Sequence, residues 1–220
     1  MMAPVHVPHL LRLFVDRLAP GAALPLPAGN RVIYVRDGET TIGAAGQTAA
    51  LPENRAWRGD GACSASGGPG GATLVRWELA DADVPAGPNL CHEARILLDA
   101  DEQYLLRCDR VDFPPGGIAY THTHRGPGVR MLLCGSLQVQ VGGRAQDIQP
   151  GQCWFEAGPD PVLALAAKDV ATSFVRCLVL PAALRGQPSI RYLLEEDRNK
   201  PRTQRYQVFV DDIITIHAGR

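Results

Sequence analysis

The chain has 220 residues, a length that allows one large domain or two smaller ones to bury a hydrophobic core. The 22 Lys and Arg residues nearly balance the 23 Asp and Glu residues, so the net charge is −1 at pH 7. This charge provides no field to hold a nucleic acid or an anionic membrane, and we expect neither partner. No basic segment followed by an apolar run opens the sequence, and no apolar run approaches the ~18 residues of a membrane span. We therefore expect a cytoplasmic protein.

Cysteine usage supports the same location. The six cysteines are scattered without any C-x-x-C pair, in a chain too long to need disulfide staples. We expect reduced thiols, most of them packed in the interior.

The first half of the chain reads mainly as short strands. Residues 8–18, "PHLLRLFVDRL", suit either a short helix or a strand, and residues 31–42, "RVIYVRDGETTI", read as strand, Gly-centred turn and strand. The Gly-rich residues 64–72 have no lysine after them, so they predict a flexible hairpin loop rather than a phosphate site. Residues 80–89, "ADADVPAGPN", read as a connector.

The second half continues in the same way. Residues 91–107 predict strands that begin a second unit, and residues 129–141, "VRMLLCGSLQVQV", repeat the strand, turn and strand pattern. The basic residues 198–205 lack interleaved aromatic side chains and predict a solvated loop. Residues 206–216, "YQVFVDDIITI", predict a final strand.

The two halves contain a repeat. Five pairs of like residues are separated by 97 positions, namely Gly38 and Gly135, Ile42 and Val139, Gly46 and Gly143, Leu51 and Ile148, and Trp57 and Trp154. The flanks agree as well, since "LVRWEL" at 74–79 resembles "FVRCLVL" at 174–180. Matches in a constant order indicate a duplicated unit of roughly 80 to 90 residues.

The pattern as a whole predicts an all-β protein. A chain of short strands leaves exposed sheet edges unless the sheets close or pair, which favours barrels or double sheets. We expect an N-terminal β unit over residues 1–88, a C-terminal β unit over 89–183, and an extension over 184–220 that contains the final strand.

A pair of histidines marks the second unit. His122 and His124 lie two apart in "GGIAYTHTHRGPG", and residues two apart on a strand point to the same face. Two imidazoles on an interior face would form half of a metal site, whereas an H-x-H pair by itself is also common in ordinary packing.

The surroundings of this pair resemble the first motif of the cupin superfamily. Gly116, five residues, the two histidines, and then six residues between Gly128 and Gly135 reproduce the frame of that motif. The stretch "PGQCWFEAGPDPV" at 150–162 is similar to the second cupin motif. The resemblance covers residues 12–180, and with the duplication it implies a bicupin of two jelly-roll, or double-stranded β-helix, barrels.

The metal motif is incomplete. Gly128 stands where the family has a ligating Glu, and Val162 stands where it has a third His. In the first unit, the positions 97 residues before His122 and His124 are Pro25 and Pro27, which cannot bind a metal. We therefore expect the N-terminal unit to be structural or to act as a lid.

Glu156 is the best candidate to complete the site. A set of His122, His124 and Glu156 would suit a divalent ion such as iron or manganese, with nickel and zinc also open. Arg130 shares the inward parity of position 128 and would clamp the carboxylate of a substrate. The alternative is that Arg130 and Glu156 pair with each other, because unpaired buried charges are costly.

Two kinds of function follow from the resemblance. The first is a metal-dependent, dioxygenase-like enzyme in the C-terminal barrel, with Arg130 and Glu156 as catalytic residues acting on a small organic substrate. The alternative is a non-catalytic bicupin that binds a small ligand, which the loss of two usual ligands favours. A homodimer is plausible for either, and a purely structural role is the weaker third reading.

Overall fold

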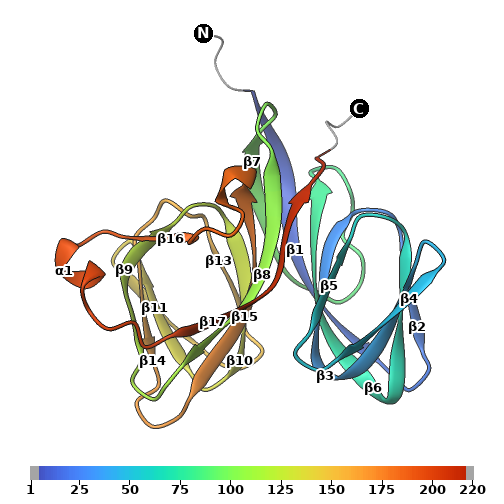
Figure 1. Cartoon of the computed structure of the whole chain (residues 1–220), viewed down its shortest axis with the longest axis horizontal. Coiled ribbons are helices and arrows are strands. Elements are labelled where there is room, and N and C mark those ends of the chain that lie inside the picture. Colours follow the sequence, from blue (N-terminus) through green and yellow to red (C-terminus); the bar gives the residue numbers. More distant parts are fainter. Residues whose placement is uncertain (1–4, 217–220) are drawn as a thin grey trace. The chain divides into compact units, whose positions relative to one another are not determined.

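The computed structural model describes residues 5–216, which are built almost entirely from β-strands (Figure 1). They divide into two compact units. Within the described residues, the N-terminal unit covers 5–102 and 214–216, and the C-terminal unit covers 103–213. The predicted all-β fold is confirmed.

The N-terminal unit is one antiparallel sheet. Its strand order is β4-β3-β6-β1-β7, with β2 paired to β6 and β5 paired to β3. The segment 8–18, which suits either a helix or a strand, lies within a strand. The strands are β1 (His6–Leu18), β2 (Ala23–Leu26), β3 (Asn30–Ala44), β4 (Gln47–Pro52), β5 (Ala56–Gly59), β6 (Cys63–Asp81) and β7 (Leu90–Asp99).

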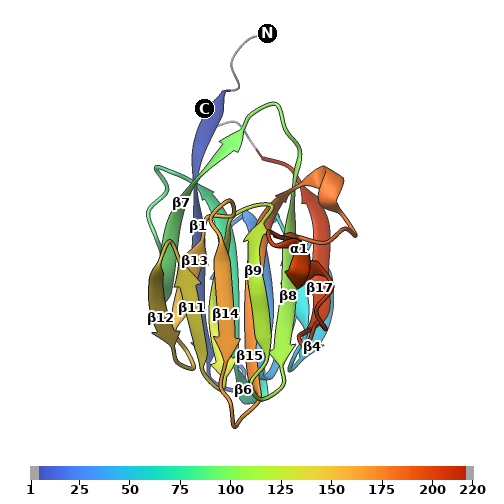
Figure 2. The ribbon, with the colours of Figure 1, turned by 90° about the vertical axis from the view of Figure 1, so that its left-hand side faces the viewer.

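The C-terminal unit consists of two five-stranded sheets, of order β13-β10-β15-β8-β17 and β12-β11-β14-β9-β16. Figure 2 shows β12, β11, β14 and β9 side by side. The elements are β8 (Tyr104–Phe113), β9 (Ile118–His124), β10 (Gly128–Cys134), β11 (Leu137–Val141), β12 (Arg144–Ile148), β13 (Cys153–Glu156), β14 (Val162–Ala166), β15 (Thr172–Pro181), the 3₁₀-helix η1 (Ala182–Leu184), β16 (Ile190–Tyr192), the helix α1 (Glu195–Arg198) and β17 (Arg205–Ile214).

The strands follow the period of two that their sequences predict. In β11, Leu137 and Val139 are buried, whereas Gln138 between them is half-buried. The buried apolar side chains gather into core clusters, around Ile33 and Leu74 in the first unit and around Leu132 and Trp154 in the second. A further cluster of the second unit consists of Leu105, Leu178, Leu180 and Leu184. Burial of these apolar side chains in the interior is what holds each unit together.

The repeat is preserved in the strand pairing. In the N-terminal unit Thr40 faces Leu51 across β3 and β4, and in the C-terminal unit Leu137 faces Ile148 across β11 and β12. Each of the latter residues lies 97 positions after its counterpart. The turn glycines Gly38 and Gly135 both have a positive φ, of 79° and 76°. The duplication inferred from the sequence is therefore a duplication of register.

The boundary between the units differs from the predicted one at 88 and 89. Strand β7 follows the Pro-rich connector, yet it pairs along its length with β1 and completes the N-terminal sheet. Strand β17 lies beside β8 in a sheet of the C-terminal unit, so most of the predicted extension is part of that unit. Residues 1–4 and 217–220, at the ends of the predicted ranges, lie outside the described residues.

The Gly-rich segment 64–72 is not the predicted hairpin loop, since it lies within β6. Its glycines allow the strand to approach the backbone next to the end of β1. A Cβ atom at Gly71 would lie 2.6 Å from the carbonyl oxygen of Leu18, and one at Gly67 would lie 2.5 Å from that of Ala19. Glycine is required here for close packing of backbone rather than for flexibility.

Within residues 5–216, no helix has the length and apolar character needed to cross a membrane. All six cysteines are free thiols, and Cys63, Cys108 and Cys177 are buried.

Candidate functional site

The two histidines lie together inside the C-terminal unit. Strand β9 carries both, and the side chains of His122 and His124 are 5% and 6% exposed. Their Nε2 atoms are 3.2 Å apart, and the rings meet edge to face with centroids 4.8 Å apart. The parity of the strand thus places both imidazoles on one interior face.

Hydrogen bonds define the protons on these rings. Nδ1 of His122 lies 2.7 Å from the carbonyl oxygen of Tyr120, which can only accept, so Nδ1 donates and Nε2 keeps a lone pair. Nε2 of His124 lies 2.7 Å from Oε2 of Glu156. Burial lowers the pKa of His122, and burial together with the charge of Arg130 lowers the pKa of His124 to about 3. Both rings are neutral at pH 7.

Glu156 ends β13, directly opposite Gly128 of β10. Its Oε1 accepts a hydrogen bond of 2.8 Å from Nε1 of Trp154, and its Oε2 lies 2.8 Å from Nη2 of Arg130. Burial alone would raise the pKa of Glu156, but Arg130 and His124 outweigh burial and hold this pKa well below its usual range. The buried side chain is therefore a carboxylate.

Arg130 on β10 is 1% exposed. Besides its contact with Glu156, the guanidinium donates from Nη1 to the carbonyl oxygen of Gly128 at 2.7 Å. Burial lowers the pKa of Arg130 to about 10, although Glu156 opposes this shift, so the group is a cation at neutral pH. Of the two roles considered for Arg130, the structure contains the pairing with Glu156. We call His122, His124, Arg130 and Glu156 the polar centre.

The polar centre does not fit a three-ligand metal ion. Among residues 5–216, no three or more His, Cys, Asp or Glu side chains form a group that could hold a metal. Oε2 of Glu156 already interacts with both Arg130 and His124, and Oε1 with Trp154. The two Nε2 atoms are 3.2 Å apart, but Nε2 of the neutral His124 carries the proton that faces Oε2 of Glu156, so an ion would have to displace this proton and separate the carboxylate from its partners.

A second buried ion pair in this unit was not foreseen. Arg176 on β15 donates to Asp109 on β8 with Nε to Oδ1 at 2.7 Å, and both residues are almost fully buried. One signal of it was present in the sequence, because the repeat places Arg76 and Arg176 at matching positions of "LVRWEL" and "FVRCLVL".

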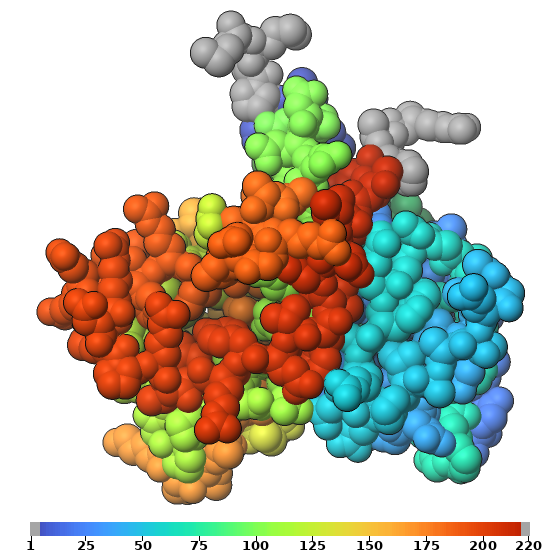
Figure 3. All heavy atoms as spheres, in the orientation of Figure 1, coloured from blue at the N-terminus to red at the C-terminus, as the bar shows by residue number. Residues whose placement is uncertain are grey.

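Residues 190–206 cover the histidine strand, and we call them the covering segment. In Figure 3 the orange to red atoms that include it spread over the green strands of the same unit. Tyr192 on β16 faces His122 in register, with the ring centroids 6.2 Å apart. Nε2 of Gln204 lies 3.4 Å from the hydroxyl of Tyr192, and Lys200 lies over the ring of Tyr120. The segment 198–205, predicted to be a solvated loop, is therefore packed in part on tyrosines. No local sequence pattern predicts this packing.

No protein-family model and no curated protein matches this sequence. Solved structures do match its fold. AerE from Microcystis aeruginosa has a TM-score of 0.60 and 13% identity over 80% of this chain and 98% of its own. An oxalate decarboxylase mutant from Bacillus subtilis has a TM-score of 0.58 and 13% identity over 81% and 73% of the two chains. Salicylate 1,2-dioxygenase from Pseudaminobacter salicylatoxidans has a TM-score of 0.56 and 12% identity over 90% and 74%.

These proteins are cupins, and the matches extend over both units. The chain has a bicupin fold. Identities of 12% to 16% among the cupins that match show this fold and leave the chemistry open.

The departures from the cupin metal motif have a structural basis. Val162 is buried and faces His122 across β14 and β9, so an apolar side chain fills the place of the family's third histidine. At Gly128, an added Cβ would meet the side chain of Leu178 and lie 2.9 Å from the carbonyl oxygen of Cys177. The C-terminal cupin barrel therefore has no room for the family's usual carboxylate at position 128.

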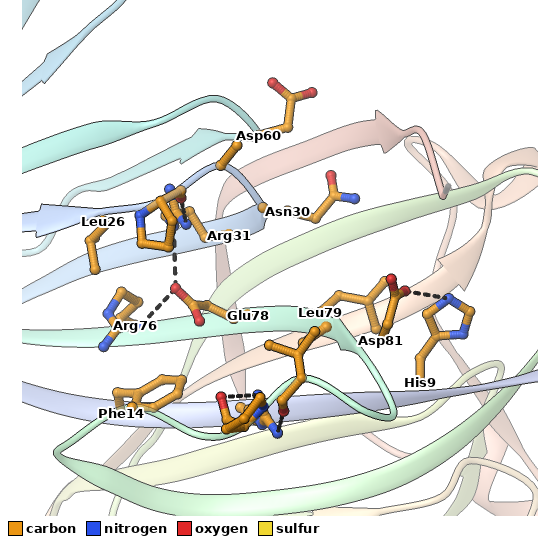
Figure 4. Close-up of a pocket in the computed structure, with 18 of the residues that line it drawn as sticks. His9, Phe14, Leu26, Asn30, Arg31, Asp60, Arg76, Glu78, Leu79 and Asp81 are labelled. Atoms are coloured by element: carbon orange, nitrogen blue, oxygen red, sulfur yellow. Dashed lines mark hydrogen bonds and ion pairs between the residues drawn. The ribbon is translucent and has the colours of Figure 1, made fainter. Parts of the chain in front are cut away.

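A cavity lies in the N-terminal cupin barrel, the unit from which the sequence predicted no site. Its volume is about 630 Å³, and Figure 4 shows side chains from several strands around it. Pro25 and Pro27, which stand at the positions of the two histidines, both line it. The apolar part of the lining includes Phe14, Leu24, Leu26, Leu79, Val84 and Ile216.

The polar part of this lining includes three arginines and four carboxylates. They are Arg12, Arg31, Arg76, Asp16, Asp60, Glu78 and Asp81. Nε of Arg76 lies 2.7 Å from Oδ2 of Asp16, and its Nη1 lies 2.6 Å from Oε1 of Glu78. The prolines at these two positions cannot bind a metal, and the interior that they line is charged.

Proposed function

We propose that the chain is a cupin-fold protein that binds a small organic molecule in the cavity of its N-terminal barrel. The observation that supports this proposal is the cavity itself. Small-molecule sites usually have volumes of about 300 to 1,000 Å³ and combine an apolar lining with a few fixed polar groups. The cavity of about 630 Å³, with Phe14 and Leu26 beside buried arginines, has both properties.

The fixed polar groups are rigid. Arg76 is held by Asp16 and Glu78 and lies over the ring of Phe14, with Cζ 3.9 Å from the centroid. Arg12 donates to the carbonyl oxygen of Val84 at 2.5 Å, which ties the lining segment 84–88 to β1. A cavity whose walls are fixed before binding loses little entropy when a ligand enters.

Filling the cavity tests the proposal. Ala80 lines it, whereas Ala82 is exposed and does not. We expect Ala80→Phe to weaken ligands found by a thermal-shift screen of small amines, acids and sugars by at least about tenfold, because the added ring occupies their space. Titration calorimetry measures the affinities. Ala82→Phe serves as the matched control, and equal affinities in both variants would contradict the assignment.

Metal binding in the C-terminal barrel is the second candidate function. It is favoured by the 3.2 Å separation of the two neutral histidine Nε2 atoms. His122 and His124 would hold the ion, with Glu156 as a third ligand only after it leaves Arg130. The dioxygenase-like activity and the catalytic roles of Arg130 and Glu156 expected from the resemblance depend on this candidate.

A designed third ligand tests the second candidate. We expect Mn²⁺ or Zn²⁺ to bind weakly to chelator-treated protein, because two ligands are fewer than the three that catalytic metals usually keep. Val162→His, which faces His122, should tighten binding at least about tenfold. The double variant His122→Ala and His124→Ala should abolish binding. Calorimetry and metal content by mass spectrometry measure both, and unchanged binding in the double variant would refute the pair as ligands.

A cytoplasmic location and a homodimer stay predictions, and the small organic ligand is the partner that this proposal requires.

A further inference from the structure

The arginines of the N-terminal cavity could suggest an anion site, but each of their guanidinium nitrogens already has a partner within the protein. Arg12 donates from Nε to Glu93 at 2.7 Å and from its two terminal nitrogens to the carbonyl oxygens of Val84 and Pro85. Arg76 donates to Asp16 through two nitrogens and contacts Glu78 through the third. Each nitrogen of both guanidinium groups therefore already has a protein partner.

Arg31 is committed in the same way. It donates from Nε to Oε1 of Glu78 at 3.3 Å, from Nη1 to the carbonyl oxygen of Gly61 at 3.0 Å, and from Nη2 to the carbonyl oxygen of Pro27. Its side chain is 1% exposed. A carboxylate entering the cavity would therefore meet cations whose hydrogen bonds are already made within the protein.

The lining carboxylates keep oxygen atoms that no described residue pairs. Both arginine contacts of Glu78 use Oε1, so its Oε2 has no partner among the described residues, and the side chain is 21% exposed. The side chain of Asp81 is 47% exposed, and among the described residues its one ion-pair partner is His9, at 3.8 Å. Asp60 uses Oδ2 for Arg58 and keeps Oδ1.

His9 supplies the second and independent sign of a ligand. Its side chain is 3% exposed and lines the cavity. Nδ1 lies 3.1 Å from the carbonyl oxygen of Val7, so Nδ1 donates and Nε2 carries a lone pair. In the neutral ring that buried Nε2 is an acceptor; it has no hydrogen-bond partner in the described part of the chain and lies 3.8 Å from Oδ1 of Asp81. Figure 4 shows His9 and Asp81 facing each other, apart from the cluster of Arg31, Arg76 and Glu78.

The balance of charged side chains in the lining also favours a ligand that donates hydrogen bonds. The four lining carboxylates outnumber the three lining arginines, and Glu78, Asp81 and Asp60 each keep a carboxylate oxygen without a partner among the described residues. A buried acceptor without a donor is costly, so the favoured occupant is one that brings donors. The apolar lining around Phe14 and Leu26 suits a hydrocarbon body.

We propose that the cavity binds a small organic cation, a primary amine carried on an apolar body, and discriminates against carboxylates. The ammonium group donates to Asp81 and His9 or to Glu78, and the apolar body lies against Phe14 and its neighbours. This inference rests on the proposed function, because it names the class of ligand for the same cavity.

Matched probes separate the classes of ligand. Phenethylamine, 2-phenylethanol and phenylacetate share a ring and a short chain and differ in the end group, which is cationic, neutral or anionic at pH 7.5. We expect phenethylamine to bind the full chain at least about tenfold more tightly than the other two in titration calorimetry. The preference should shrink in 0.5 M NaCl, because salt screens the partly exposed carboxylate of Asp81.

Two variants locate the contact. Asp81→Asn keeps the size of the side chain and removes its charge, and we expect it to weaken phenethylamine about fivefold while leaving 2-phenylethanol unchanged. Asp83→Asn is the matched control, because Asp83 is exposed and does not line the cavity. Glu78→Gln is a second variant, and circular dichroism checks that it folds, since Glu78 also holds two arginines.

The outcomes separate this inference from the proposed function. Tighter binding of the amine that is weakened by Asp81→Asn or Glu78→Gln supports both. Binding of phenylacetate or 2-phenylethanol as tightly as the amine, blocked by Ala80→Phe, overturns the cation class and keeps the cavity. Binding of none of the three probes, together with no effect of Ala80→Phe on any ligand from the screen, overturns both.

Discussion

Replacing Arg130 by Met is expected to lower the free energy of unfolding of the C-terminal unit by about 3 to 5 kcal/mol. The methionine matches the stem of the arginine but leaves the carboxylate of Glu156 buried without its cation. His124 is the remaining partner at 2.7 Å, and it is neutral. An uncompensated buried charge is among the most destabilising changes that one substitution can make.

Urea unfolding followed by circular dichroism measures this loss. The double variant Arg130→Met and Glu156→Gln should recover much of it, because a neutral amide needs no cation and still accepts from Trp154. Arg144→Met, at an exposed position on β12, is the control and should change stability by less than about 0.5 kcal/mol. A loss at position 130 no larger than at position 144 would show that the buried pair is not needed for stability.

The fold was predictable because its signals are local and repeated. Alternation such as that of Leu137 and Val139 shows strand period within five residues, and the repeated turn glycines show that the unit occurs twice. The register at Thr40 and Leu51 then follows from the register at Leu137 and Ile148. A duplicated pattern of this kind specifies the architecture at a sequence identity too low for family models to match.

Boundaries were less predictable because strand pairing is not local. A Pro-rich connector precedes β7, and connectors usually separate units, but β7 returns to pair with β1 at the other end of the N-terminal unit. The sequence of residues 90–99 does not by itself specify β1 as the pairing strand. The glycines of 64–72 show the same limitation, since Gly71 serves contact with the distant carbonyl oxygen of Leu18 rather than a turn.

In the candidate site, too, the local features were predictable from the sequence and the contacts between distant residues were not. Strand parity was enough to place His122 and His124 on one face, and it left open whether Glu156 would meet them or Arg130. In the structure Glu156 contacts both His124 and Arg130, and strand parity alone does not determine which of these contacts forms. The N-terminal cavity was not predicted because its lining comes from β1, β2, β3, β6 and the segment 84–88, and no motif joins these parts of the sequence. Pro25 and Pro27 exclude a metal site of the cupin kind in the first unit, but they do not exclude a cavity, and both of them line it.

Acid is expected to destabilise the C-terminal unit through its histidines. The folded-state pKa of His124 is about 3 and that of His122 is also lowered by burial, whereas both are near 6.5 in an unfolded chain. Between pH 6.5 and 3 the unfolded chain binds protons that the folded chain does not, so stability is full above pH 6.5 and falls as the pH decreases. The slope is about 1.4 kcal/mol per pH unit for each histidine that stays neutral in the folded state. Glu156, with its lowered pKa, adds to the loss below about pH 4.3.

Urea unfolding at pH 7.0, 6.0 and 5.0 measures how the free energy of unfolding changes with pH. This slope is compared rather than the stability at one pH, because substitutions in the polar centre also change packing. The double variant His122→Asn and His124→Gln has no imidazole left to protonate, so its stability should change less with pH than that of the natural chain. His6→Gln is the control, since His6 lies at the exposed start of β1 in the other unit, and its slope should match that of the natural chain. A double variant that loses stability with acid as steeply as the natural chain would mean that these two rings take up protons in the folded state. The polar centre would then hold a charged imidazole beside Glu156, and its chemistry would have to be derived from an ion pair rather than from two neutral rings.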